Sequence, residues 1–106
     1  MNDTHDSEHV TEIVLFVPGL FPLGHIVATP GVADTLDPAD VAGALGRHAA
    51  GDWGDVDEHD WEANANAVEH GGRILSVYHA DTNGERFWVI TEADRLTTTV
   101  LFPSEY

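Results

Sequence analysis

The fold is decided by residues 73–102, which read RILSVYHADTNGERFWVITEADRLTTTVLF. Three runs rich in β-branched and aromatic side chains, residues 73–80, 86–91 and 97–102, predict three strands. The pair Asn83-Gly84 between the first two runs favours a tight hairpin turn. These residues therefore predict an antiparallel three-strand meander.

Two segments upstream of the meander carry the start and stop signals of helices. The first begins with Asp37 as a capping residue before Pro38, and the second begins near Asp57 and ends at Gly71-Gly72. Spacings of three and four residues predict the buried faces: Val41, Leu45 and His48 or Ala49 in the first helix, and Trp61, Ala65 and Val68 in the second.

Shorter signals precede these helices. The run TEIVLFV, residues 11–17, predicts an N-terminal strand, and residues 26–28 predict a brief extended segment. Thr29 can cap a short helix whose first residue is Pro30. The predicted fold class is α+β, with two helices packed on the C-terminal meander and a short N-terminal strand.

The chain length fits one domain, since 106 residues with 42% hydrophobic side chains can form a single core. We expect residues 1–10 to be a disordered tail and residues 11–106 to form the domain. There is no Cys, which excludes disulfides and thiolate metal sites. Because no apolar run reaches the ~20 residues of a membrane helix and no secretory signal is recognisable, the expected location is the cytoplasm.

The charge is strongly acidic. Nineteen Asp and Glu face four basic residues, all Arg, giving a formal net charge of −15 with neutral His. A surface adapted to a salt-rich cytoplasm explains both the acid excess and the missing Lys, and we favour this halophile interpretation. A nucleic-acid mimic and an ordinary acidic protein are the alternatives. Direct nucleic-acid binding is not expected, because it needs a basic patch.

The acids are unevenly distributed along the chain. Residues 1–46 contain seven acids and residues 51–70 seven more, and neither segment has any Lys or Arg. Residues 71–106 contain five acids and three Arg. The nearly balanced last third is therefore the first place to look for a functional surface.

The densest polar cluster of the predicted sheet is the first candidate site. Two carboxylates, an Arg and several hydroxyls in one turn could hold a phosphate or polarise a carbonyl. The favoured alternative is a structural turn pinned by an ion pair. Strict alternation puts Ser76 and Tyr78 on one face of their strand and Arg73 on the other. The cluster comprises Arg73, Ser76, Tyr78, Thr91, Glu92, Asp94, Arg95 and Thr98.

The second predicted helix carries polar residues at helical spacing. His59, Glu62, Asn66 and His70 share one face, a pattern that can hold a metal but is also typical of a solvated helix face. We favour the solvated face and expect no metal and no cofactor. Asp60 and Asn64, four residues apart, are interpreted as anchoring the helix to the preceding loop.

That loop, GDWGD at residues 51–55, is interpreted as a structural motif. It lacks the spacing and the Lys of a phosphate-binding loop, and its acids would repel phosphate. Trp53 is expected to plug the core, while Gly51 and Gly54 permit the tight chain reversal. Asp52 and Asp55 are the other two residues of the motif. His79 is expected to be a histidine at the edge of the core rather than a general base.

Several blocks resemble a widespread family of short prokaryotic proteins that are labelled hypothetical or plasmid-related. The resemblance implies a self-contained domain and a mobile-element setting, and it implies no established activity. It runs from Phe21 to Tyr106 through FPLG (21–24), ATPG (28–31), GDWGD (51–55), GGRILSVY (71–78), FWVITEADR (87–95) and TTVLFPSEY (98–106).

Three functions remain open from the sequence. The first is a non-enzymatic protein that binds another protein through its near-neutral sheet. The second is a small ribonuclease, by analogy of element order, using Glu92, Arg95, Arg73 and a His. The third is a nucleic-acid mimic that inhibits a DNA-binding enzyme. The sequence does not decide the partner or the oligomeric state.

Overall fold

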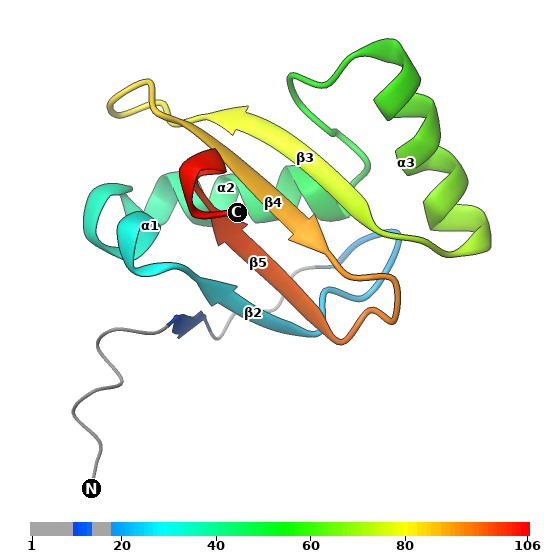
Figure 1. Ribbon diagram of the computed structural model, residues 1–106, viewed down its shortest axis with the longest axis horizontal. Helices are drawn as coiled ribbons and strands as arrows, with labels where there is room; N and C mark the ends of the chain where they lie inside the picture. The colour runs from blue at the N-terminus through cyan, green and yellow to red at the C-terminus, as the bar shows by residue number, and fades with distance from the viewer. Residues whose placement is uncertain (1–9, 14–17) are drawn as a thin grey trace, which may run out of the picture.

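The structure is a computed structural model that describes residues 10–13 and 18–106. Its elements form a five-stranded sheet with helices behind and beside it (Figure 1). In chain order they are β1 (Thr11–Ile13), β2 (His25–Ala28), α1 (Pro30–Thr35), α2 (Pro38–Ala49), α3 (Glu58–His70), β3 (Ile74–His79), β4 (Arg86–Thr91), β5 (Thr97–Leu101) and the 3-10 turn η2 (Pro103–Glu105).

The sheet has the strand order β1-β2-β5-β4-β3 and is mixed. The predicted meander is present, with β3 antiparallel to β4 and β4 antiparallel to β5. It is not the whole sheet, because β2 pairs in parallel with β5 and β1 pairs antiparallel with β2. The three-strand prediction was therefore too small. Both added strands lie where extended segments were predicted, at residues 11–17 and 26–28, but runs of three and four residues do not reveal which strands they pair with.

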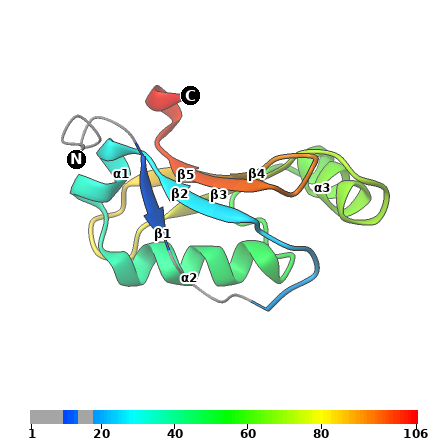
Figure 2. The same ribbon diagram turned by 90° about the horizontal axis from the view of Figure 1, so that it is seen from below.

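Helix α2 covers one face of the sheet (Figure 2). It begins where the sequence predicts, since the Asp37 side chain accepts a hydrogen bond from the backbone N–H of Ala39, and Pro38 is its first residue. The predicted face is buried, with Leu45 and His48 fully inaccessible to solvent. Each of the four strands β2 to β5 contributes buried side chains to the core beneath this helix, among them Ile26 of β2, Tyr78 of β3, Phe87 of β4 and Val100 of β5.

Helix α3 lies beside the edge strand β3 rather than on a face of the sheet (Figures 1 and 2). The prediction for its buried face was wrong in part, because Trp61 and Ala65 are exposed and only Val68 packs partly against the core. The buried residues of α3 are Asn64 and Ala67. A helix that covers a strand edge needs a polar residue to pair the free backbone groups there, so its apolar stripe is narrow.

Two devices pair the free edge of β3. The Asn64 amide donates to the carbonyl of Leu75 at 2.7 Å and accepts from its N–H at 3.2 Å. Two residues further along, Val77 donates to the carbonyl of Trp53 at 3.0 Å and accepts from the N–H of Asp55 at 2.7 Å. The GDWGD loop thus acts as a short sixth strand. The expected anchoring of α3 to this loop was wrong, because Asn64 bonds to β3 instead and Asp60 is exposed.

Some predictions fall on residues outside the described part. The tail predicted for residues 1–10 lies outside it except for Val10, and the predicted strand 11–17 is described as far as Ile13. Over the described residues, no helix is long and apolar enough to cross a membrane.

Candidate functional site

The structure divides the candidate cluster among three places. Ser76, Thr91 and Thr98 face α2 and are fully buried. Arg73 and Glu92 lie on the opposite side, with Arg73 Nε 3.5 Å from a Glu92 carboxylate oxygen. The remaining members, Asp94, Arg95 and Tyr78, have backbone partners elsewhere. The eight residues therefore do not converge on one pocket.

The buried members form a hydrogen-bonded network around His48 of α2. The Nδ1 atom of His48 lies 2.6 Å from the Ser76 hydroxyl of β3, and its Nε2 atom lies 2.9 Å from the Thr91 hydroxyl of β4. Thr91 contacts the hydroxyl of Thr98 on β5 at 2.7 Å, and Thr98 donates to the carbonyl of Leu23 at 2.7 Å. Four elements are thus joined through side chains that are 0% exposed.

The network has one consistent direction of donation. The carbonyl of Leu23 can only accept, so the single proton of the Thr98 hydroxyl is used there. Thr98 must then accept from Thr91, and Thr91 must accept from His48 Nε2. His48 is therefore the Nε2–H tautomer, and its Nδ1 atom accepts from Ser76. Each of the three hydroxyls in this network therefore donates one hydrogen bond and accepts at most one.

A serine hydroxyl that donates to a histidine is the arrangement of an activated nucleophile. Here it does not form an active site, because both side chains are fully buried. Burial, with Arg95 nearby, lowers the pKa of His48 from its usual value of 6.5 to about 3. A histidine that stays neutral down to this pH is a poor base at neutral pH. The role of the network is therefore structural: its hydrogen bonds hold α2 to the three strands of the meander.

We predict that this histidine makes the protein sensitive to mild acid. In the unfolded chain His48 takes up a proton near pH 6.5, whereas in the folded protein it stays neutral down to about pH 3. The contribution of neutral, buried His48 to the free energy of unfolding is complete above pH 6.5 and is lost as the pH falls toward 3. Relative to a His48→Gln variant, which does not titrate, the wild type should lose about 2 kcal/mol between about pH 7 and pH 5.

Urea unfolding of both proteins across this pH range measures that difference, and taking the difference cancels the titration of the carboxylates. Equal pH slopes for wild type and His48→Gln would contradict a buried neutral His48.

Arg95 acts as a cap for backbone carbonyls. It has a positive φ of 63° at the turn between β4 and β5, and its guanidinium donates to the carbonyls of Gly72 at 2.6 Å and Ala67 at 2.8 Å. It thereby closes the C-terminal end of α3. The Asp94 carboxylate accepts from the N–H of Leu96 at 2.9 Å. These bonds are those of a structural turn. Of the two ion pairs expected there, Asp94 with Arg95 is not formed, since Arg95 contacts carbonyls, whereas Glu92 does pair with an Arg, Arg73.

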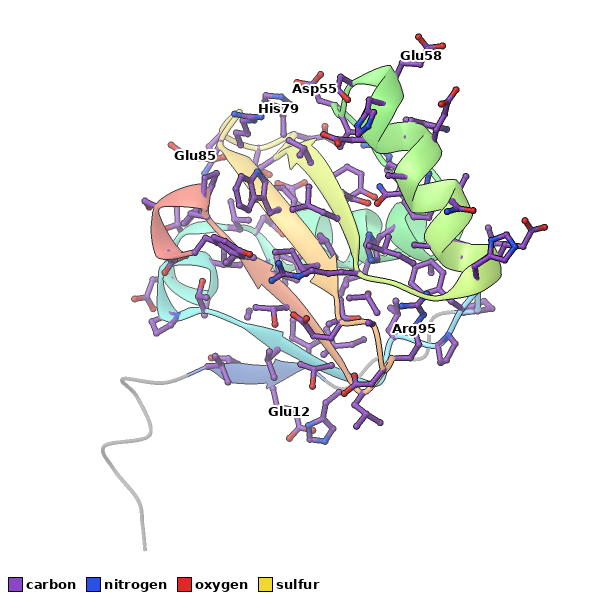
Figure 3. The ribbon with its side chains drawn as sticks, turned by 45° about the vertical axis from the view of Figure 1, so that its right-hand side comes forward. Glu12, Asp55, Glu58, His79, Glu85 and Arg95 are labelled. Atoms are coloured by element: carbon purple, nitrogen blue, oxygen red, sulfur yellow. The ribbon has the colours of Figure 1, made fainter. Side chains whose placement is uncertain are left out.

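Tyr78 and the GDWGD loop hold each other in place. The Tyr78 hydroxyl donates to the carbonyl of Asp52 at 2.6 Å, and the guanidinium of Arg47 lies 4.7 Å from the centre of the Tyr78 ring. Arg47 Nε also donates to the Asp52 carboxylate at 2.8 Å. Trp53 is 2% exposed, so it plugs the core as predicted. His79 is on the other face of β3, where it is exposed and 3.2 Å from Asp55 (Figure 3).

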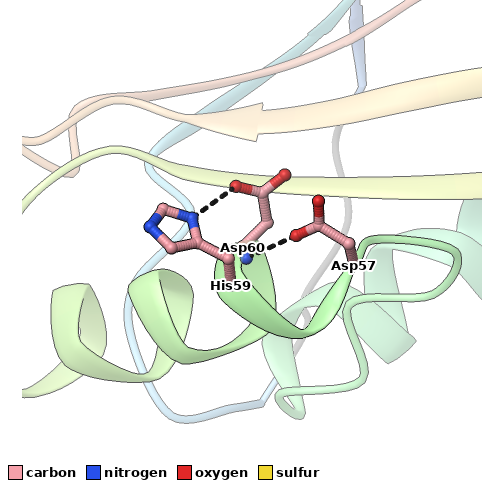
Figure 4. A group of neighbouring side chains, drawn as sticks. All are labelled: Asp57, His59 and Asp60. Carbon is pink, nitrogen blue, oxygen red and sulfur yellow. Dashed lines mark hydrogen bonds and ion pairs between the residues drawn. The ribbon is translucent and has the colours of Figure 1, made fainter.

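The N-terminal turn of α3 contains the one cluster of potential metal ligands found among the described residues: Asp57, His59 and Asp60 (Figure 4). All three are exposed, and Asp57 caps the helix by accepting from the N–H of Asp60 at 2.8 Å. Exposed acids in the first turn, one of them already a helix cap, are typical of a helix start and do not by themselves make a metal site. Within the helix His70 contacts Asn66 at 2.8 Å, and His59 and Glu62 are exposed, as expected of a solvated face.

The sheet face opposite α2, here called the open face, was not singled out by the sequence. No described helix lies on it, and η2 alone crosses it (Figures 1 and 2). By strand register its central residues are Leu75 and Val77 of β3, Trp88 and Ile90 of β4 and Leu101 of β5. Period-two alternation in 75–77 and 88–90 is the signal that could have found it.

Trp88 is the largest side chain of the open face and is half-buried. Its ring meets that of Tyr106 edge-on with 5.6 Å between centroids, and the guanidinium of Arg73 lies 5.1 Å from the Tyr106 ring. The Nε1–H of Trp88 is buried and has no acceptor among the described residues. An unpaired buried donor costs about 1–3 kcal/mol, a cost that a shift of the ring opening it to an acceptor would relieve.

A groove of about 570 Å³ runs between the open face and the segment leading into α3. We call it the open-face groove. Its floor is Leu75, Val77 and Trp88, one side carries three Asp, and Arg86 lies on the β4 side. The lining comprises Asp55, Val56, Asp57, Asp60, Leu75, Val77, Arg86 and Trp88.

Comparison with protein-family models, with curated proteins and with solved structures found no match.

Proposed function

We propose that this chain is a non-enzymatic protein-interaction module that binds its partner through the open face. The observation that carries the proposal is Trp88, a half-buried aromatic with an unpaired Nε1–H on a sheet face without a helix. Tryptophan is enriched at the centres of protein interfaces because it joins a large apolar area to one hydrogen-bond donor.

The dispersal of the candidate cluster supports a binding role over catalysis. The Ser76–His48 pair is closed to solvent, and Arg95 is committed to carbonyls of the protein itself. A ribonuclease built on Glu92, Arg95 and Arg73 would need a histidine beside them. Among the described residues, no hydrogen bond or ion pair joins a histidine to the Arg73–Glu92 pair.

The described acidic side chains lie at the surface, and their excess has a role separate from partner recognition. None of the described Asp and Glu side chains is buried. Carboxylates at the surface are what adaptation to a salt-rich cytoplasm requires, since they hold water in brine and their repulsion is screened by salt. The acid excess serves solubility, and the choice of partner depends on the open face; the partner belongs to a mobile-element setting.

The test is partner capture at molar KCl with tagged wild-type protein, followed by cross-linking and mass spectrometry. Trp88→Ser and Leu75→Arg alter the open face at two independent positions. Leu96→Ser is the matched control, because Leu96 is 68% exposed in the turn between β4 and β5. The variants are first compared by circular dichroism to select those that remain folded.

We expect one stoichiometric partner with wild type and Leu96→Ser, and at least about a tenfold lower recovery with a folded open-face variant. Equal recovery with all variants would overturn the proposed surface, and the absence of any stoichiometric partner would overturn the proposed function.

A further inference from the structure

We infer that the open-face groove binds a cationic, amphipathic protein segment, with a Lys or Arg side chain against its acidic side and an apolar side chain over its floor. This inference rests on the proposed function and names the class of partner. The charge, the apolar floor and the hydrogen-bonding groups of the groove each match a different part of such a segment.

The acidic side of the groove comes from the loop and first turn before and within α3. Asp55, Asp57 and Asp60 all line it and all are exposed. Two of them contact histidines, with His79 3.2 Å from Asp55 and His59 3.5 Å from Asp60, and Asp57 accepts from the backbone N–H of Asp60. No Lys or Arg of the described chain forms an ion pair with these carboxylates. The acidic side therefore keeps its negative charge for a ligand.

The floor of the groove requires an apolar contact. Leu75 and Trp88 are half-buried, and Val77 between them is 5% exposed. A simple cation would leave Leu75 and Trp88 exposed to water, whereas a ligand with an apolar side chain next to a basic one would bury them. The floor therefore distinguishes an amphipathic segment from a metal ion or a polyamine.

The β4 side of the groove supplies donors. Trp88, whose Nε1–H is unpaired, and the exposed Arg86 are the β4 residues that line the groove. A peptide backbone carries a carbonyl at every residue, so an extended segment can place an acceptor here while its side chains meet the floor and the acids.

Charge argues against the other occupants. A second copy of this acidic chain, a nucleic acid or an anionic lipid surface would bring negative charge into direct contact with the three Asp of the groove, where salt screens least. A protein segment with net positive charge is the partner class that matches the acidic side, the apolar floor and the donors together.

The experiment uses two labelled synthetic peptides as probes, Ac-Gly-Lys-Leu-Lys-Val-Lys-Gly-amide and its counterpart with Glu in place of Lys. Fluorescence anisotropy with the full chain is measured at about 0.2 M and about 2 M KCl. We expect binding of the lysine peptide, no binding of the glutamate peptide, and weaker binding at the higher salt concentration.

The variant Asp55→Asn/Asp60→Asn removes two charges from the groove and leaves the Asp57 cap intact. The control Asp34→Asn/Glu69→Gln removes the same charge from exposed positions outside the groove. We expect at least about a tenfold loss of affinity for the groove variant and less than about a twofold loss for the control. Trp88→Phe, which deletes the Nε1–H and keeps an aromatic ring, should weaken binding several-fold.

Equal losses in the two charge variants would mean non-specific attraction by net charge and would overturn the inference. The inference also fails if a partner is captured through the open face but neither peptide binds, and the proposed function then stands alone. If the lysine peptide binds the groove and no cellular partner is captured, the proposed function fails while the recognition chemistry holds.

Discussion

Replacement of His48 with leucine is expected to lower the free energy of unfolding by about 3–4 kcal/mol, although leucine is close to histidine in size. The change leaves the Ser76 hydroxyl without its acceptor and the Thr91 hydroxyl without its donor, and both are fully buried. A buried polar group that loses its partner costs about 1–3 kcal/mol. Urea unfolding at about pH 7, with the slope and the midpoint both fitted, measures the loss.

A rescue variant separates hydrogen bonding from packing. In His48→Leu/Ser76→Ala/Thr91→Val the orphaned hydroxyls are removed, while Thr98 still donates to the carbonyl of Leu23. We expect the triple variant to regain at least half of the lost stability, because replacing both partners of a buried hydrogen bond with apolar groups is nearly neutral. A triple variant less stable than His48→Leu would show that the ring acts through its packing.

The elements that could be predicted from the sequence are those whose signals are local. The bounds of β4 match the prediction at both ends, and α2 begins at Pro38 after the expected Asp37 cap. A strand run and a capping pair are written in neighbouring residues, so no knowledge of the rest of the chain is needed. The parallel pairing of β2 with β5 joins residues about 70 positions apart and leaves no local trace.

The candidate site shows the same limit. Alternation correctly placed Ser76 and Tyr78 on one face of β3, and that face is buried. It could not show that His48 would complete the cluster, because His48 contacts residues 28 and 43 positions further along the chain. Nor could it show that Arg95 would adopt a positive φ and bond to carbonyls near the end of α3. These are tertiary contacts that appear when α2, α3 and the sheet pack.

Replacement of Gly54 with alanine is expected to have the largest effect of any single methyl group added to this chain. Gly54 has a φ of +74°, and a Cβ placed there would lie 2.0 Å from the carbonyl oxygen of Val77. Relief of that overlap must move the loop away from β3. The movement breaks the two hydrogen bonds of Val77 with Trp53 and Asp55 and withdraws Trp53 from the core. We expect a loss of about 4 kcal/mol or more.

Gly84 supplies the matched control, because it has the same φ of +74° and nothing lies within 4 Å of the position of its Cβ. Gly84→Ala should therefore carry the backbone cost alone, about 1–2 kcal/mol. The difference between the two variants, measured by urea unfolding under one set of conditions, isolates the contact of the GDWGD loop with β3. A difference below about 1 kcal/mol would mean that the loop yields without disturbing the edge strand. A larger difference, together with increased exposure of Trp53 by fluorescence quenching, is the expected result because the loop pairs β3 and plugs the core at once.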